Sequence, residues 1–195
     1  MEVWLGHAEE YLDGKPTEAL RELFLQNDCG PVAATIQGGL LTSQVDARRE
    51  NWAHFEKRLA LCSAVTIPTL ILAGDVHGPL GPEDLGRLSA SLVESAKRAA
   101  DAGVRFALEF DARASFPTNL QSAVALIEDV GLPSLGICLH WFPFPWVQAN
   151  SLICTFSHRR WSHSFSYLML QTSQEKWPVM QIEFCQQRGI HHRSN

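Results

Sequence analysis

The sequence has no excess of positive charge. Its 16 Lys and Arg residues are outnumbered by 21 Asp and Glu residues, which gives a net charge of −5 at pH 7. Local basic runs such as His158-Arg159-Arg160 are short. We therefore expect no general electrostatic affinity for nucleic acid.

The sequence also lacks the signals of secretion and of membrane insertion. No apolar run reaches the roughly 20 residues of a membrane span. The first residues contain neither a basic nor an apolar leader region, so no signal peptide is expected. The five cysteines are odd in number and none form a CxxC pair, which disfavours a disulfide framework and a zinc knuckle. Reduced, mostly buried thiols in a cytoplasmic protein are the prediction.

What the sequence does contain is a globular composition, with 46% hydrophobic and 19% charged residues over 195 positions. Apolar runs bounded by turn residues predict strands in five places. We place these strands at residues 3–5, 32–36, 68–73, 104–110 and 135–139.

Helical periodicity fills the intervals between these strands. One helix is predicted over 18–27, with Thr17 as its cap, and a long one over 46–63. A third begins at Pro82 and ends at Gly103, and a fourth follows a cap at Thr118 or Asn119. The expected buried positions of the second and third helices are Trp52, Phe55, Leu59 and Cys62, and Leu85, Leu88, Leu92, Val93 and Ala96.

The centres of the predicted strands lie about 30 to 37 residues apart, with a helix in most intervals, which is typical of serial βα units with parallel strands. Two α/β architectures fit this pattern, a (β/α)8 barrel and an open doubly wound parallel sheet. No GxGxxG motif follows the first strand, so a dinucleotide-binding fold has no positive support.

Glu109 is the strongest candidate for a functional residue. It stands near the end of the strand 104–110, and a carboxylate there is costly unless it is paired, hydrogen-bonded or bound to a metal. Chemistry in parallel α/β proteins gathers at the carboxyl ends of the strands. A purely structural role, with a buried Arg or a backbone group as partner, is the alternative.

Four stretches together resemble the sugar phosphate isomerase/epimerase family, which has a xylose-isomerase-like TIM barrel. The resemblance covers residues 1–144, and its run from Leu70 to Leu139 is the most specific part. It implies a partial barrel of about five βα units, in which the first strand and the last units are missing or diverged. The four stretches are 2–5, 70–72, 102–109 and 130–139, which are similar to the second, fourth, fifth and sixth strand regions of the family.

The resemblance implies a divalent metal, Mn²⁺, Mg²⁺ or Zn²⁺, at the top of the barrel. The metal would polarise a sugar while paired carboxylates move a proton between adjacent carbons. Glu109 matches the metal-ligand glutamate of the fifth strand, which makes it the expected catalytic and metal residue. His140 and Pro143 occupy the positions of the family's sixth-strand Asp-x-x-His. His140 can ligate a metal, whereas Pro143 cannot.

Other expected companions of Glu109 are absent from the pattern. The histidine of the seventh strand and the glutamate of the eighth, which would be the partner carboxylate, have no visible counterpart. His77 lies where related apurinic endonucleases place a metal-binding histidine before Pro-Gly, but here Gly78-Pro79 follows. We interpret His77 as a loop residue and keep metal binding as the weaker alternative. Asp75 is interpreted as a turn residue, with an acid that supports a ligand residue as the alternative. Asp111 and Arg113 are interpreted as a solvated loop, with contact to substrate as the alternative.

The pattern is lost after residue 144. Residues 145–195 read as an irregular tail, in which 151–156, 167–170 and 181–185 are candidate strands and His191-His192 is a disordered end. One hypothesis is that the chain is a fragment of a longer gene whose reading frame shifts between Trp141 and Pro145. A genuinely divergent C-terminus is the alternative. An open remnant of a barrel would leave sheet edges unpaired, which favours self-association.

Three functions of different classes follow from the sequence. The first is a sugar (phosphate) isomerase or epimerase that acts on a small carbohydrate with a divalent metal. The second is a catalytically inactive half barrel that binds or assembles with a partner, and the third is an inactive fragment. An apurinic-endonuclease-like metal hydrolase is a weaker alternative, because the chain lacks a basic groove.

Overall fold

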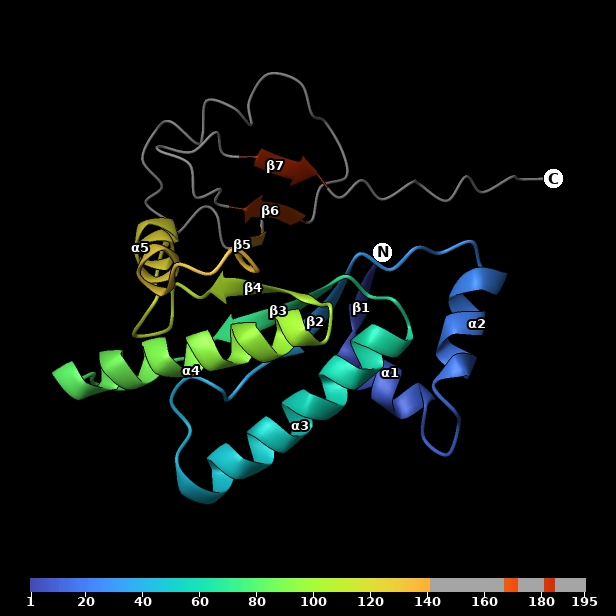
Figure 1. Ribbon diagram of the computed structural model, residues 1–195, viewed down its shortest axis with the longest axis horizontal. Coiled ribbons are helices and arrows are strands. Elements are labelled where there is room, and N and C mark those ends of the chain that lie inside the picture. Colours follow the sequence, from blue (N-terminus) through green and yellow to red (C-terminus); the bar gives the residue numbers. More distant parts are fainter. Residues whose placement is uncertain (141–166, 172–180, 185–195) are drawn as a thin grey trace.

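A computed structural model describes residues 1–140, 167–171 and 181–184. Its described strands form one sheet whose order follows the chain, from β1 to β7 (Figure 1). The first five strands are parallel, and β6 and β7 continue the sheet as antiparallel strands. The strands are β1 (Glu2–Trp4), β2 (Ala33–Gln37), β3 (Thr69–Gly74), β4 (Arg105–Phe110), β5 (Leu135–His140), β6 (Tyr167–Gln171) and β7 (Gln181–Phe184).

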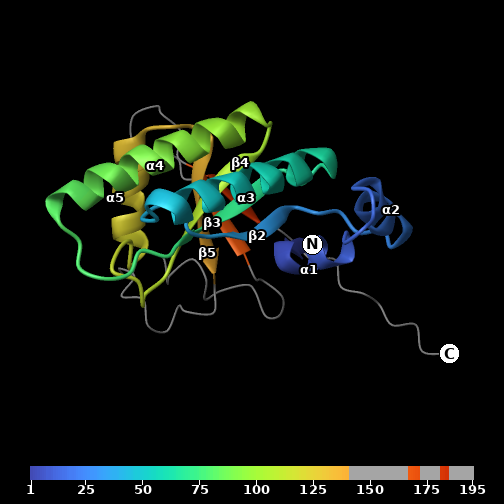
Figure 2. The ribbon, with the colours of Figure 1, turned by 90° about the horizontal axis from the view of Figure 1, so that it is seen from below.

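The helices occupy the crossovers between the parallel strands. Helices α3 and α4 lie side by side along one face of the sheet (Figures 1 and 2). No helix within the described part of the chain is long and apolar enough to cross a membrane. The helices are α1 (Leu5–Tyr11), α2 (Glu18–Gln26), α3 (Val45–Ala64), α4 (Pro82–Asp101) and α5 (Leu120–Val130).

The strand order decides between the two architectures that the sequence left open. A doubly wound sheet reverses its strand order at a switch point. Here β1 to β5 are neighbours in chain order and all parallel, as in a barrel wall. The prediction of a partial (β/α)8 barrel is confirmed, and the alternative of an open doubly wound sheet is wrong. The sheet formed by the described strands is not closed.

Alternation along the strands separates two apolar clusters. Leu70, Leu72, Phe106 and Leu108 face the helices and belong to the main core. The residues between them face the other way, because successive side chains of a strand point to opposite faces. A small second cluster forms on that opposite face, which we call the inner face. It contains Ala33, Ile71, Ala107 and Cys138, with Ile36 partly packed against it.

The two long helices are held together around Trp52. Its ring packs edge-on against Phe55, with centroids 5.9 Å apart. The guanidinium groups of Arg48 in α3 and Arg98 in α4 lie 4.9 Å and 4.8 Å from its centroid. Arg48 also donates to the Ser91 hydroxyl of α4 at 2.9 Å. Cation–π contacts of this kind add to the apolar packing between the helices.

Most local predictions are confirmed, with three corrections. Helix α1 was not predicted, and it takes Leu5 out of the first strand. Leu85 is 46% exposed, because it stands in the first turn of α4 before that helix reaches the sheet. Thr17 precedes α2, but its side chain makes no capping bond. Asn119 is confirmed as the cap of α5, accepting from the Ser122 amide at 2.9 Å.

The predictions for the tail are tested only in part. Strands β6 and β7 lie where two of the three tail strands were predicted. The strand predicted over 151–156 and the His191-His192 end lie outside the described residues. The same holds for Pro143 and for the proposed shift of reading frame between residues 141 and 145.

Candidate functional site

Glu109 is placed on the inner face, near the carboxyl end of β4. Its neighbours Leu108 and Phe110 belong to the main core on the helix side, so Glu109 points to the opposite face. In the sheet it is in register with Ala73 of β3 and Cys138 of β5. The residue is half-buried, and its Oε2 atom is shielded from solvent. This is the position at which a strand-end carboxylate can act on a ligand.

The backbone beside Glu109 depends on Gly74, the last residue of β3. A Cβ atom on Gly74 would stand 2.8 Å from the carbonyl oxygen of Glu109 and 3.2 Å from Cδ of Pro117. The first contact is too close for a real side chain and the second is tight, so glycine allows β3 and β4 this approach. Gly74 therefore sets the spacing of the two strands at the candidate site.

Asp75 connects the exits of β2 and β3. Its Oδ2 accepts a hydrogen bond from the Gly39 amide at 2.8 Å. Its Oδ1 is buried and has no hydrogen-bond partner. The expectation that Asp75 is a plain turn residue is incomplete, because its side chain fixes a loop 36 positions earlier in the chain.

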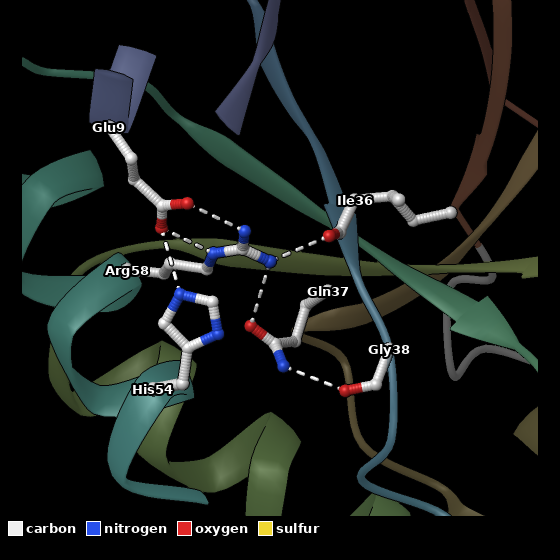
Figure 3. Close-up of polar contacts among 6 residues, drawn as sticks. All are labelled: Glu9, Ile36, Gln37, Gly38, His54 and Arg58. Carbon is white, nitrogen blue, oxygen red and sulfur yellow. Dashed lines mark hydrogen bonds and ion pairs between the residues drawn. The ribbon is translucent and has the colours of Figure 1, made fainter. Parts of the chain in front are cut away.

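The exit of β2 is anchored by a polar network from two helices (Figure 3). Arg58 of α3 donates to both carboxylate oxygens of Glu9 in α1, at 2.7 Å and 2.9 Å. It also donates to the Ile36 carbonyl at 2.8 Å and to the buried Gln37 side chain at 3.4 Å. The Gln37 amide in turn donates to the Gly38 carbonyl at 2.7 Å.

The Glu9 carboxylate also contacts the His54 ring, whose Nε2 lies 3.0 Å from Oε1 (Figure 3). Hydrogen bonding to Arg58 is the largest cause that holds the pKa of Glu9 below its ordinary value. Together with Asp75, this network holds the β2 exit from both sides. Its hydrogen bonds tie the end of β2 to α1 and α3.

His77 is exposed in the loop that follows β3. In the loop that follows β4, Asp111 pairs with Arg113 at 3.0 Å. The hydrogen bond from Arg113 is the main cause of the lowered pKa of Asp111, and the charge of His77 adds a smaller effect. Asp111 and Arg113 thus form an exposed loop pair, which agrees with their interpretation as a solvated loop.

The β3 and β4 exit loops are joined at Val76, the residue before His77. The Ser115 amide donates to the Val76 carbonyl at 2.7 Å, and Val76 forms an isolated antiparallel bridge with Phe116. The loop that carries His77 is therefore fixed to the loop that follows Glu109.

His140, the second candidate ligand, is the last residue of β5. Its backbone pairs with Tyr167 of β6, and it stands two positions after Cys138, the register partner of Glu109. Among the described residues, no three His, Cys, Asp or Glu side chains are grouped so as to hold a metal ion. The described site therefore does not complete a metal centre by itself.

Glu2 is a polar residue of the inner face. It belongs to the stretch 2–5 of the family resemblance, but the sequence predicted no role for it in the site. It precedes Val3, which is buried in the main core, so Glu2 faces the inner side of β1. Its carboxylate accepts a hydrogen bond from the Thr35 hydroxyl of β2. The sequence signal for Glu2 is alternation around Val3, because a buried Val3 places its neighbour Glu2 on the other face of the strand.

A family model described as xylose isomerase-like TIM barrel matches residues 2–144. The chain belongs to this family. The match begins at Glu2 and includes all five parallel strands with their connecting helices. No curated protein matches the chain significantly.

Solved structures share the barrel fold of the family at low sequence identity. A zinc-bound IolI protein has a TM-score of 0.68 and 20% identity, over 76% of this chain and 55% of that chain. A D-psicose 3-epimerase, solved in the presence of D-fructose, has a TM-score of 0.56 and 21% identity, over 70% of this chain and 51% of that chain.

A xylose isomerase domain protein from Alicyclobacillus acidocaldarius has a TM-score of 0.56 and 16% identity, over 70% of this chain and 51% of that chain. The chain thus spans about half the length of these three structures.

Proposed function

We propose that the chain is a sugar isomerase- or epimerase-like protein that transfers a proton between adjacent carbons of a small carbohydrate. The observation that carries the proposal is the position of Glu109, on the inner face near the carboxyl end of a strand in a xylose isomerase-like barrel. The names of the structural neighbours, which include epimerases of D-psicose and of L-ribulose, support the choice of substrate class.

A divalent metal is part of the proposal, with Glu109 and His140 as ligands of Mn²⁺, Mg²⁺ or Zn²⁺. When bound, such an ion would polarise the carbonyl and hydroxyl oxygens of the sugar. The zinc ion of the IolI neighbour supports a divalent metal in this fold. His77 is the weaker candidate, because it is exposed in the β3 exit loop.

The residues around Glu109 suit proton chemistry on a neutral ligand. A carboxylate can accept or return a proton when its position is fixed and water is kept away. Ala107 and Ile71, both buried, form an apolar floor next to Glu109 on the inner face. Gly74 and the Val76–Ser115 bond keep the two strand exits around it in place.

Binding of Mn²⁺ tests this proposal. We expect calorimetry of the full chain to show one site per chain, and Glu109→Gln to weaken it by about 100-fold or more. Glu128→Gln, the same change at an exposed position of α5, is the matched control and should bind like wild type. A folded wild-type chain that binds no Mn²⁺ would contradict the proposal and favour the alternative, a half-barrel binding or assembly protein.

The compartment proposed for this protein is the cytoplasm. Cys29, Cys62 and Cys138 are free thiols, and the latter two are buried. Free cysteines are usual where glutathione and thioredoxin keep thiols reduced.

A further inference from the structure

A second carboxylate lies on the same inner face as Glu109. Glu2 belongs to β1, which is separated from the Glu109 strand β4 by β2 and β3. Its orientation follows from Val3, which is 5% exposed and packs on the helix side. The Thr35 hydroxyl of β2 donates to Glu2 Oε1, which fixes the carboxylate toward the inner face.

The sheet register places Glu2 and Glu109 on the same face. Glu2 is the partner of Ala33 in β2, and Ala33 belongs to the inner-face cluster. Glu109 is the partner of Cys138 in β5, which belongs to the same cluster. The two carboxylates therefore border one apolar cluster at its two ends.

The floor between the two carboxylates is small and apolar. Ala33 of β2, Ile71 of β3 and Ala107 of β4 are buried there, together with Cys138. Three of these four side chains are small, and an apolar surface keeps ionic interactions strong. Two carboxylates that flank such a floor are placed to act on one small molecule from two sides.

We propose that Glu2 is the second carboxylate of the site and the proton-transfer partner of Glu109. The inference rests on the proposed function. The Glu2 carboxylate would remove the proton from a carbon next to the sugar carbonyl, and the C–H electron pair would form an enediolate. The Glu2 carboxylic acid would then exchange this proton with water and return a proton to the same carbon or to the former carbonyl carbon, in the latter case while the proton of the neighbouring hydroxyl moves to the former carbonyl oxygen. The carboxylate is regenerated, and no oxidant, reductant or co-reactant is consumed.

Thr35 has a positioning role in this proposal. Its hydroxyl donates to one oxygen of Glu2, which leaves the orientation of the carboxylate fixed. The alternative is that the bond only ties the three-residue strand β1 to β2. The two roles differ in what they affect, since a tie between strands changes stability whereas a proton acceptor changes the reaction.

The test measures deuterium incorporation from D₂O into D-fructose, D-psicose and L-ribulose by the Mn²⁺-loaded chain. We expect Glu2→Gln to lower the exchange rate at least 100-fold while its Mn²⁺ affinity stays within 10-fold of wild type. Glu2→Asp should restore part of the rate, and Thr35→Val should lower it by less than 10-fold. Glu10→Gln, an exposed change in α1, is the matched control and should exchange like wild type.

Urea unfolding of the same variants separates the two roles of Glu2. If Glu2→Gln and Thr35→Val lose equal stability and equal exchange, Glu2 is a structural tie and the inference is overturned. Exchange at the wild-type rate in Glu2→Gln overturns it as well, without affecting the role of Glu109. A wild-type chain that exchanges none of the three sugars overturns the proposed function, and this inference with it.

Discussion

The carbonyl oxygen of Glu109 lies 2.8 Å from the point that a Cβ atom would occupy on Gly74. Gly74→Ala would therefore force β3 and β4 apart beside the candidate site. We expect a loss of about 1–3 kcal/mol in the free energy of unfolding, as for other overpacked positions. Urea denaturation of the variant and of the wild type measures this loss.

Gly86→Ala is the control for that substitution. Gly86 lies inside α4, and a Cβ atom there would meet nothing within 4 Å. Alanine in a helix interior should raise stability by about 0.5–1 kcal/mol. Equal stability of the Gly74→Ala chain and the wild type would show that the strands can separate without cost.

Arg58 is the centre of the network at the β2 exit, and its side chain is 12% exposed. Arg58→Ala removes its hydrogen bonds to Glu9 and to the Ile36 carbonyl. We expect the free energy of unfolding to fall by about 1–3 kcal/mol. The loss is limited because Glu9 is partly solvated. Arg49→Ala, which removes an exposed pair with Asp46, should cost at most about 0.5 kcal/mol. Similar losses in both variants would argue against the network.

Glu9 also predicts a pH dependence of stability. Its pKa is lowered in the folded state from an ordinary value of 4.5, first by the hydrogen bond from Arg58. A lowered pKa contributes stability above pH 4.5 that is lost as the pH falls through the folded value. The stability difference between wild type and Glu9→Gln should therefore be largest near neutral pH and shrink below pH 4.5. A difference that stays constant down to pH 3 would contradict this assignment.

The buried thiol of Cys62 predicts that stability depends on pH in the alkaline range. Burial raises the pKa of its thiol from 9.0 to about 12. A raised pKa contributes stability below pH 9 that is lost as the pH rises toward 12, with a slope near 1.4 kcal/mol per pH unit. Cys62→Ala, which costs stability at neutral pH, should approach the wild type over this interval in unfolding experiments. Parallel curves from pH 9 to 11 would contradict the prediction.

We propose that the chain self-associates through its edge strand β1. Within the described residues, β1 pairs with β2 and lies at one end of the sheet. Trp4 of this strand is 58% exposed. Because an open edge offers backbone hydrogen bonds to a second chain, we expect the mass measured by light scattering to rise with concentration. A monomer at all concentrations would contradict this proposal.

The barrel wall could be predicted from the sequence because its signals are local. Continuous apolar runs such as 70–73 mark strands that are covered on both faces, and Trp52 and Phe55 mark the buried side of α3. Helix α1 was missed because it follows β1 without a turn and has only two buried residues, Leu5 and Ala8.

The candidate site could be predicted only at Glu109, where one carboxylate interrupts an apolar strand. The contacts that surround it join residues far apart in the chain. Asp75 reaches Gly39 over 36 positions, and Arg58 reaches Glu9 over 49. No local pattern encodes such contacts. Glu2 was overlooked because a strand of three residues gives too little alternation to assign its faces.

The agreement between strand order and chain order has a consequence for how the protein is made. Each parallel strand pairs with the one synthesised just before it, so no strand waits for a distant partner. Only the crossover that carries the intervening helices separates each parallel strand from the strand it pairs with. The chain can therefore acquire its barrel wall one βα unit at a time as it leaves the ribosome, and a nascent chain arrested after β4 should already protect the amides of β3 from hydrogen exchange.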